Sequence, residues 1–377
     1  MKVLALLTYY YPHWTGLTAY AQRLSEGLAA RGHHVTVLTS RFQQDLAPED
    51  EHHGVHIRRL RPWLRLSRGQ VMPSLPFALY RLVREHDVVQ VHAPCLEVAL
   101  AGALAHQAGR KMLMTHHGDL VMPGGWRDQF VQKAVGFLLD QGADSADMIS
   151  IHSRDYADHS DYLHPYRDKV VAIYPPVEIP PPDIQAVAAW REELGLNHAK
   201  LVGFAGRFVE EKGFDYLLKA IPLIKERMPE VKFVFAGEPK VVYENFFERC
   251  RPLLEAHQEQ LVMLGLIKDP QKLANFYAMC DVFALPSRTD CFPSVQIEAM
   301  LCGTPVVATS IPGAREVVTV TGMGRLVEPC SEESLADGLL EVLSHRESYV
   351  KPYQHIRHIF DTEETISAYE RLLQSLL

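Results

Sequence analysis

The chain has 377 residues, of which 47% are hydrophobic and 22% charged, and its net charge is −8. This length predicts two or three domains, each large enough for its own hydrophobic core. The acidic excess disfavours a general nucleic-acid-binding protein, so we expect no nucleic-acid partner. The six cysteines form no C-x-x-C pair, which argues against a disulfide framework and a structural zinc site and indicates a reducing, cytoplasmic location.

The first half alternates short apolar runs with amphipathic segments. Its first run, Val3–Leu7, is too short for the core of a signal peptide, and we interpret it as a buried strand. A helix is predicted over Leu17–Arg31, where apolar residues recur at helical spacing. Further strands are predicted at His34–Thr39, Val88–His92, Lys111–His116, Asp147–His152 and Lys169–Ile173. The chain has no run of about twenty apolar residues, so no membrane span is expected.

The second half repeats this alternation, which predicts a second parallel, doubly wound sheet. Its strands are predicted at Leu201–Ala205, Lys232–Ala236, Leu261–Gly265, Val282–Leu285 and Pro305–Ala308. The segment Tyr174–Pro182 contains five prolines in nine residues, which marks a stiff linker. We therefore predict an α/β protein with domains at 1–178 and 183–357. Ligands are expected at the carboxyl ends of the strands, in the cleft between the domains.

A glycine-rich loop with two cations follows the first strand of the second half. In Gly203–Phe214, Arg207 and Lys212 bracket the predicted start of a helix. Glycines let backbone approach a ligand closely, and helix N-termini favour anions. The pattern therefore fits a diphosphate site. On these residues alone, a loop with two solvated cations is an equal alternative.

Two carboxylates lie eight positions apart in the segment Asp290–Glu298. Pro293 is expected at the first position of a helix, since a missing N–H costs nothing there. The amides at this helix start can face phosphate, and the carboxylates can accept hydrogen bonds from sugar and ribose hydroxyls. Without its apolar neighbours, Glu298 would be interpreted as a solvated helix-surface charge.

The ends of three predicted strands in the first half carry further candidates. Gly16 follows the first strand and opens the first helix, where it allows a ligand to come close or simply makes an ordinary turn. His116 and His117 end another strand, and adjacent strand residues point in opposite directions. We therefore expect only one of the two to face a ligand and the other to pack behind it, and His92, at the end of the preceding strand, is a further candidate.

The two second-half motifs resemble those of the family 4, group 1, retaining glycosyltransferases of the GT-B fold. Asp290–Glu298 resembles the family's E-x7-E motif, with Asp in place of the first Glu and Pro293 where many relatives have Gly. The run Gly206–Gly213 matches the family's G-R-x-x-x-x-K-G pattern. The resemblance implies two Rossmann-type domains facing a central cleft, the first binding the acceptor and the second the donor. It also implies that a C-terminal helix, 358–377, packs back on the first domain.

The resemblance also implies roles for single residues. Arg207 and Lys212 hold the donor diphosphate, Glu298 binds the ribose, and His117 contacts the transferred sugar. The predicted catalytic residues are His117, Arg207, Lys212 and Asp290. The predicted donor-binding residues are Gly16, Arg207, Lys212, Asp290, Phe292, Pro293, Ser294, Val295 and Glu298. His92 and His116 are predicted to contact the acceptor or to support residues that do.

We therefore predict a retaining transferase that moves a hexose-type sugar from a UDP- or GDP-linked donor to a hydroxyl acceptor, lipid-linked or glycan. No metal or other cofactor is expected, because Arg207 and Lys212 can neutralise the diphosphate. Two alternatives stay open: a nucleotide-sugar epimerase of the same fold, and a non-catalytic two-lobed sugar-binding protein. A nicotinamide-dependent dehydrogenase is disfavoured, since no G-x-G-x-x-G follows either leading strand.

The segment 55–84 contains no Asp or Glu and mixes basic with aromatic and aliphatic residues. Its arginines are Arg58, Arg59, Arg61, Arg65, Arg68, Arg81 and Arg84, and its large apolar residues include Trp63, Leu64, Leu66, Met72, Phe77 and Tyr80. This composition suits an anionic membrane surface or a lipid-diphosphate acceptor, and it predicts peripheral attachment to the inner face of a membrane. A solvated loop with a partly buried apolar side is the alternative.

Overall fold

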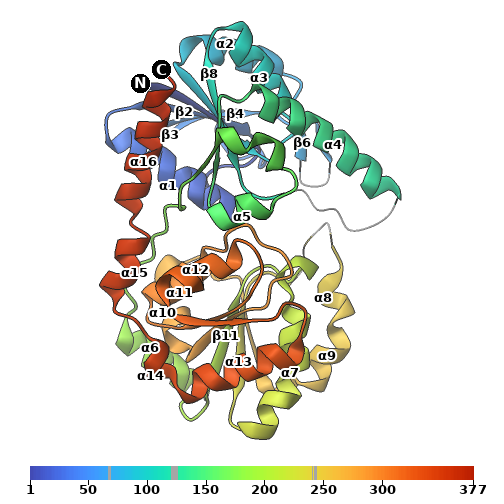
Figure 1. Cartoon of the computed structure of the whole chain (residues 1–377), viewed down its shortest axis with the longest axis vertical. Coiled ribbons are helices and arrows are strands. Elements are labelled where there is room, and N and C mark those ends of the chain that lie inside the picture. The colour runs from blue at the N-terminus through green and yellow to red at the C-terminus, as the bar shows by residue number, and fades with distance from the viewer. Residues whose placement is uncertain (67–68, 120–125, 240, 242–243) are drawn as a thin grey trace. The chain divides into compact units, whose positions relative to one another are not determined.

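The computed structural model describes residues 1–66, 69–119, 126–239, 241 and 244–377; Arg68 is outside the described residues. These residues separate into two compact units. The first unit is formed by residues 1–176 and 362–377, and the second by residues 177–361. Each is an α/β layer structure with its own sheet (Figure 1). The prediction of two doubly wound sheets is confirmed.

Within the described part of the first unit, eight strands form one sheet in the order β10-β9-β8-β7-β1-β2-β4-β3. Neighbouring strands are parallel except at the edge, where β3 runs antiparallel to β4. The strands are β1 (Lys2–Leu6), β2 (His34–Ser40), β3 (Glu49–His52), β4 (Val55–Leu60), β7 (Val88–Ala93), β8 (Lys111–His116), β9 (Met148–Ile151) and β10 (Val170–Ala172). A separate short hairpin pairs β5 (Leu64–Leu66) with β6 (Gly69–Val71).

Helices cover both faces of this sheet (Figure 1). They are α1 (Gly16–Ala30), α2 (Leu75–Glu85), α3 (Val98–Gln107), α4 (Trp126–Ser145), α5 (Arg154–His159) and α16 (Thr362–Ser375), with a 3-10 turn at His164–Lys169. Apolar residues of β1, β2 and β4 form one core with α1 and α16, including Val3, Leu24, Ile57, Tyr369 and Leu373. Helix α16 therefore completes the core that β1 and α1 form with their neighbouring strands.

The described part of the second unit contains an all-parallel sheet of six strands in the order β13-β12-β11-β14-β15-β16. The strands are β11 (Leu201–Ala205), β12 (Lys232–Ala236), β13 (Leu261–Gly265), β14 (Val282–Leu285), β15 (Val306–Thr309) and β16 (Gly324–Val327). The order reverses between β11 and β14, and such a switch point is where open parallel sheets bind ligands at their carboxyl edge.

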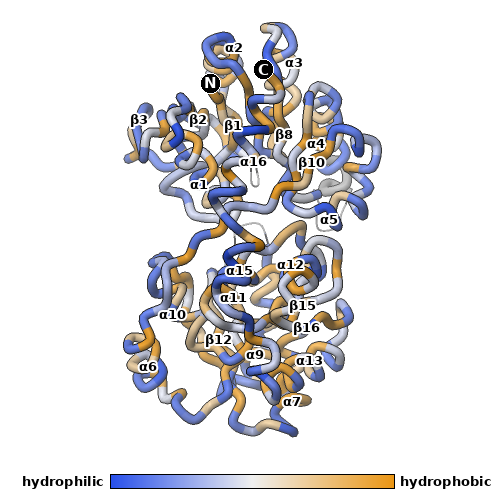
Figure 2. The backbone as a smooth tube through the Cα atoms, turned by 60° about the vertical axis from the view of Figure 1, so that its left-hand side comes forward, coloured by the Kyte–Doolittle hydropathy of each residue, from blue (hydrophilic) through white to orange (hydrophobic). Residues whose placement is uncertain are grey.

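The helices of the second unit separate its strands along the chain. They are α6 (Ile184–Glu193), α7 (Phe214–Arg227), α8 (Phe246–Arg249), α9 (Arg251–Ala256), α10 (Pro270–Met279), α11 (Val295–Leu301), α12 (Ala314–Thr321), α13 (Glu332–Ser344), α14 (Arg346–Tyr349) and α15 (Tyr353–Ile359), with 3-10 turns at Glu210–Lys212 and Gln258–Gln260. Phe204, Phe214 and Phe235 pack in one aromatic core with α7 and α13. Figure 2 shows the hydrophobic colour concentrated on the inner strands of each unit.

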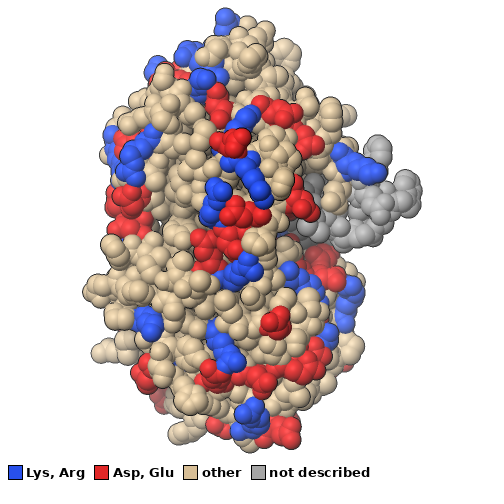
Figure 3. Space-filling view, viewed as in Figure 1, with Lys and Arg blue, Asp and Glu red and all other residues tan. Residues whose placement is uncertain are grey.

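Acidic and basic side chains are intermixed on the face of the molecule that Figure 3 shows. No helix among the described residues is long and apolar enough to cross a membrane.

Candidate active site

Two cationic side chains follow β11, at the carboxyl edge of the second unit's sheet. Arg207 lies at the start of the connection to α7, and Lys212 lies at its end. Lys212 Nζ donates to a carboxylate oxygen of Asp290, which lies in the loop after β14. Arg207 Nη2 donates to Glu211 Oε1 at 3.0 Å. The structure therefore brings together the predicted Lys212 and Asp290.

The lysine ammonium at this edge is stabilised in its charged form. Burial opposes the charge, but the carboxylates of Asp290 and Glu211 outweigh burial and raise the pKa of Lys212. The Lys212 side chain is 22% exposed and that of Asp290 only 11%. A cation is thus present at neutral pH at a partly enclosed position, where its interaction with an anion is weakly screened.

Glycines allow the loops around this pair to come together. Gly213 has a φ of 65°, and a Cβ atom there would lie 2.0 Å from the carbonyl oxygen of Pro286. Gly313 has a φ of 81°, and a Cβ atom there would lie 2.1 Å from the carbonyl oxygen of Cys291. A larger residue at Gly213 would push the turn that carries Lys212 away from the loop after β14, and one at Gly313 would push the start of α12 away from the segment that carries Asp290.

Arg288 joins the same two loops, and the sequence analysis did not single it out. Its guanidinium donates two hydrogen bonds of 2.8 Å to the carboxylate of Asp215 and lies 4.4 Å from the ring centre of Tyr216. It also donates to the carbonyl oxygen of Glu210 at 2.7 Å, and its amide donates to that of Glu211 at 2.8 Å. Arg288 thereby fixes the turn before α7 to the loop after β14.

The segment that leads into α11 carries four of the predicted donor-binding residues. Phe292 and Pro293 are buried, whereas Ser294 and Val295 are half-buried. The helix begins at Val295 with Ser294 at its N-cap position, so the prediction that Pro293 is the first helical residue is wrong. Proline fixes only its own φ, which also suits a residue that precedes a cap. The carbonyl of Pro293 accepts from the amide of Gln296 at 3.2 Å.

Glu298 lies in the first turn of α11 and is half-buried. The hydroxyl of Tyr277, at the end of α10, donates to Glu298 Oε2 at 2.9 Å. Burial and the charge of Glu298 raise the pKa of Tyr277 well above its ordinary value, so the phenol remains a donor at every ordinary pH. Tyr277 therefore holds the carboxylate in one place.

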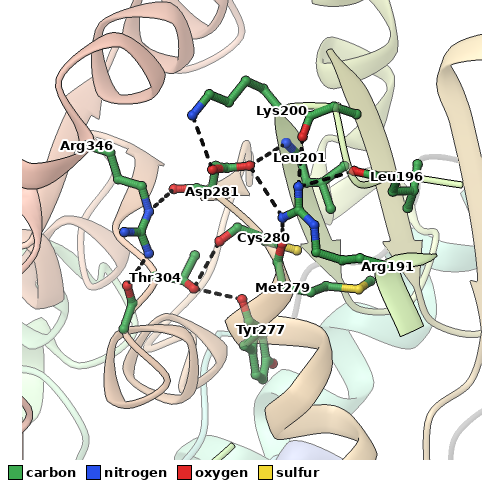
Figure 4. A network of polar contacts seen from close by, with 12 residues as sticks. Arg191, Leu196, Lys200, Leu201, Tyr277, Met279, Cys280, Asp281, Thr304 and Arg346 are labelled. Atoms are coloured by element: carbon green, nitrogen blue, oxygen red, sulfur yellow. Dashed lines mark hydrogen bonds and ion pairs between the residues drawn. The ribbon is translucent and has the colours of Figure 1, made fainter. Parts of the chain in front are cut away.

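A polar network at the amino edge of the sheet holds Tyr277 in turn (Figure 4). The hydroxyl of Thr304 donates to the carbonyl oxygen of Tyr277 at 2.7 Å. Nearby, Asp281 accepts from the amide of Leu201 at 2.8 Å, and its carbonyl accepts from Arg346 Nε at 3.2 Å. These contacts fix the ends of α10, β11 and β14, so the position of Glu298 is set from the far side of the sheet.

In the first unit, Gly16 is the first residue of α1 and is exposed. Thr15 caps the helix: its hydroxyl accepts from the amide of Thr18 at 3.3 Å, and the hydroxyl of Thr18 accepts from the amide of Thr15 at 2.7 Å. A Cβ atom on Gly16 would meet nothing within 4 Å. The fold itself therefore does not require glycine here, and the space beside it is open.

Three histidines form a hydrogen-bonded chain at the carboxyl edge of the first unit's sheet. His92 lies in β7, and His117 and His152 follow β8 and β9. His92 Nδ1 is 3.0 Å from His117 Nε2, and His117 Nδ1 is 3.0 Å from His152 Nε2. The ring of Tyr20 packs against His117 and His152, with centroid distances of 4.9 and 4.7 Å.

Burial keeps this histidine chain neutral. It lowers the pKa of His92 and of His152 to about 3 and that of His117 well below its ordinary value. A neutral imidazole has one N–H and one acceptor nitrogen, so His117 must donate to one neighbour and accept from the other. The tautomers of the three rings are consequently linked, and both ring nitrogens of His117 contact histidines.

His116 belongs to a different network, as the alternation along the strand predicts. Its Nε2 is 2.9 Å from Asp119 Oδ1, and the hydroxyl of Ser160 donates to both carboxylate oxygens of Asp119, at 3.0 and 2.9 Å. The sequence analysis did not single out His152. Like His117, it is a histidine at the end of a predicted strand, so the same pattern could have identified it.

The basic segment 55–84 is only partly the surface that its composition indicated. β4 is an inner strand, and Arg59 is 3% exposed because it donates to Asp50 Oδ2 and to the carbonyl oxygen of Tyr11, each at 3.0 Å. Met72 is also buried, at 5%. Both residues are therefore unavailable to a membrane. The side chains of Trp63 and Phe77, at 79% and 80% exposure, remain on the surface.

In comparisons with known proteins, both units match models of glycosyltransferase families. The model described as "Glycosyltransferase Family 4" matches residues 14–179, and the model described as "Glycosyl transferases group 1" matches residues 187–358. An uncharacterized glycosyltransferase of Methanocaldococcus jannaschii is 27% identical over 91% of this chain and 89% of its own length. The GDP-mannose-dependent alpha-(1-6)-phosphatidylinositol monomannoside mannosyltransferase of Mycolicibacterium smegmatis is 26% identical over 88% of this chain and 87% of its own length.

Solved structures share the fold at low identity. HepE from Anabaena, in complex with UDP-glucose, superposes with a TM-score of 0.80 and 19% identity over the whole of both chains. Sucrose-phosphate synthase from Thermosynechococcus elongatus superposes with a TM-score of 0.75 and 20% identity, covering 100% of this chain and 98% of its own. Both likenesses identify the architecture as GT-B.

Proposed function

Because this chain belongs to the group 1 glycosyltransferases of family 4, we propose that it transfers a hexose-type sugar, with retention of configuration, from a nucleotide-diphosphate donor to a hydroxyl acceptor. The observation that carries this proposal is the pairing of Lys212 with Asp290 at the switch point of the second sheet. A lysine kept charged and fixed beside Arg207 suits a leaving diphosphate, whose negative charge grows as the anomeric bond breaks.

In this proposal, the second unit binds the donor. Lys212 and Arg207 neutralise the diphosphate, Asp290 orients Lys212 and accepts from a sugar hydroxyl, and Glu298 accepts from ribose hydroxyls. Tyr277 donates to Glu298 Oε2 and so holds this carboxylate in place for the ribose. Charge stabilisation by side chains makes a divalent ion unnecessary, so we expect donor turnover to persist in a chelator.

In this proposal, the first unit binds the acceptor and contacts hydroxyl groups of the transferred sugar. His117 is held on both sides by His92 and His152 and stays uncharged, so a sugar hydroxyl that bonds to its ring nitrogens would replace one of these two histidine partners. No side chain need act as nucleophile, because the acceptor attacks from the face that the diphosphate leaves.

The donor is tested by thermal unfolding with UDP, GDP, ADP and their sugar conjugates, since a ligand that binds only the folded state raises its stability. HepE was solved with UDP-glucose, and the mycobacterial relative is named for GDP-mannose, so these two donors come first. NMR of the product's anomeric centre then tests retention. Release of an altered donor without any acceptor would instead identify an epimerase, and binding without turnover would identify a sugar-binding protein.

We further propose peripheral attachment to an anionic membrane through the exposed part of segment 55–84. Trp63 and Phe77 supply apolar side chains, and Arg84 on α2 supplies positive charge, whereas the charge of Arg81 is paired with Glu85 at 2.8 Å. Co-sedimentation with vesicles of phosphatidylcholine, with and without phosphatidylglycerol, tests this. Binding should require the anionic lipid and fall in Trp63→Ser/Phe77→Ser, but not in the control Tyr353→Ser. Equal binding by all three proteins would refute it.

A further inference from the structure

A second cluster of chemically reactive side chains lies in the first unit, apart from the histidine chain. Glu26 is on α1, His52 ends β3, and His53 lies in the turn that joins β3 to β4. His52 Nε2 is 3.5 Å from Glu26 Oε1, and His53 Nδ1 is 3.5 Å from Glu26 Oε2. One ligand atom from each of the three residues lies within 4.8 Å of those from the other two.

The two separations of 3.5 Å, each to a different oxygen of Glu26, match the spacing of ligands around a tetrahedral metal ion. Zinc binds imidazole nitrogen and carboxylate oxygen at about 2.0–2.2 Å, so two of its ligands at the tetrahedral angle are about 3.3–3.5 Å apart. Two imidazoles and one carboxylate are a recognised zinc ligand set that leaves the fourth position to water or another group. The cluster needs only small side-chain movements to converge on one ion.

Neighbouring residues already orient two of the three ligands. Gln22, one turn before Glu26 on α1, donates to Glu26 Oε1 at 2.8 Å. The ring of Tyr11 stacks on His52, with a centroid distance of 3.8 Å and an interplanar angle of 11°. Such outer contacts are what fixes ligand orientation in metal sites.

The third ligand is held by an unusual backbone. His53 has a φ of 49°, in the left-handed region that non-glycine residues seldom adopt. The following Gly54 also has a positive φ, 78°, so the pair makes the tight turn between β3 and β4. Asparagine or glycine would be the ordinary choice at position 53. A histidine there carries a conformational cost and places an imidazole beside Glu26.

Glu26 has no competing strong cation in the part of the chain that the structure describes: its ion pairs are with His52 and His53. Its side chain is only 20% exposed, and that of His52 is 21% exposed. A half-buried carboxylate paired with two imidazoles can be neutralised by protons on the histidines or by a metal ion. The matched distances and the oriented ligands favour the metal.

We propose that Glu26, His52 and His53 form a binding site for a divalent transition metal ion of the zinc class. The ion would join α1 to the β3–β4 turn. Tyr11, which stacks on His52, lies in the connection between β1 and α1 that leads to Gly16. Metal binding would therefore steady that connection. The metal ligands are distinct from the residues predicted to bind the donor, so zinc binding can be measured separately from glycosyl transfer.

The test is a ZnCl₂ titration of the full-length protein, followed by calorimetry and thermal unfolding. We expect one ion per chain at this site and a rise in the unfolding temperature. Co²⁺ should give the intense visible absorption of a tetrahedral site, whereas Mg²⁺, which prefers octahedral oxygen ligands, should not bind there. No uptake of Zn²⁺ would overturn the proposal.

Two variants remove ligands without removing the structure around them. His52→Phe keeps a ring to stack on Tyr11, and His53→Asn places in the turn a residue that tolerates the left-handed conformation. Each should weaken zinc binding at least tenfold while folding normally. Gln22→Ala, which removes only the outer contact, should weaken it by about tenfold or more.

The matched control is His56→Ala. His56 is also a surface histidine beside a carboxylate, 3.6 Å from Glu51, but among the described residues the two are not part of a three-ligand group. It should leave zinc binding unchanged. Equal loss in this control, or undiminished binding in His52→Phe/His53→Asn, would show that zinc binds adventitiously to surface histidines and would overturn the proposal.

Discussion

The carboxyl edges of the two sheets hold opposite kinds of polar group. In the second unit the edge is charged: Lys212 pairs with Asp290, and Arg288 pairs with Asp215. In the first unit the chain of three histidines at this edge is neutral, because burial removes the charge from His92 and its two histidine partners, although the carboxylate of Asp119 beside His116 stays charged. The same strand geometry therefore presents ions in one unit and uncharged donors and acceptors in the other.

This difference fits the two halves of a glycosyl transfer. A leaving diphosphate carries the negative charge and needs fixed cations, which are most effective when they do not have to reorganise. Sugar and acceptor hydroxyls are neutral and are distinguished by directional hydrogen bonds. Charge at the first edge would add little to their recognition and would attract phosphate to the wrong unit.

Removing the charge at the second edge should have the largest effect. Lys212→Ala is expected to lower kcat by roughly 10²–10³, as loss of one fixed charge-stabilising group does. Steady-state kinetics with the identified donor measures this, and Lys225→Ala at the end of α7 is the control. Full activity in Lys212→Ala would refute the idea that the charged edge of the second sheet stabilises the leaving diphosphate.

Substituting His92 or His152 should lower kcat less than Lys212→Ala does. The size of the loss should depend on whether the new side chain keeps a polar atom at the position of the ring nitrogen that bonds to His117. His152 bonds through Nε2, which glutamine can mimic, whereas asparagine ends short of it. We expect His152→Asn to lower kcat by up to about 10²-fold through misplacement of His117, and His152→Gln to recover most of it. For His92, which bonds through Nδ1, the order should reverse. Equal kinetics in all four variants would show that the chain does not position His117.

Glu298 should affect donor binding more than turnover. Glu298→Ala is expected to raise the KM for the donor by roughly 10- to 100-fold, which corresponds to the ~1.5–3 kcal/mol of hydrogen bonds to a charged group. Tyr277→Phe, which removes only the supporting hydroxyl, should raise it less. If kcat fell while KM stayed constant, the carboxylate would act on the reacting centre rather than on the ribose.

The last expected effect is on stability against acid and not on catalysis. The folded-state pKa of His92 and of His152 is about 3, against about 6.5 when unfolded. Between these values the unfolded chain binds more protons, so stability is full above pH 6.5 and falls as the pH drops toward 3. Each histidine contributes a slope of up to about 1.4 kcal/mol per pH unit. Urea unfolding from pH 7 to 4 should show a shallower fall in His92→Asn.

Strong local patterns made most of the fold predictable. β8 and β11 to β14 begin and end at the predicted residues, because each is a compact apolar run between clear breaks. The hairpin of β3 and β4 was missed, since β3 contains no apolar residue and β4 alternates apolar with polar residues instead of forming a continuous apolar run. β16 was missed because only Leu326 and Val327 are apolar in it.

The candidate site was predictable where one short segment carries the pattern. Lys212, Asp290 and Glu298 each lie in a motif that the sequence displays. Arg288 and Tyr277 could not be identified in this way, because their importance comes from partners 73 and 21 positions away. Pairings over such distances depend on the strand order, which local sequence patterns do not contain.

The return of α16 to the first unit has a consequence for dissecting the molecule. The second unit is one continuous stretch, 177–361, whereas the first is interrupted, since it needs residues 362–377 to fill its core beside β1. In topological terms the second unit is an insertion within the first. A gene fragment that ends at Pro176 would thus encode a protein with an open apolar groove, and a short linker from Pro176 to Thr362 is the natural way to express the first unit alone.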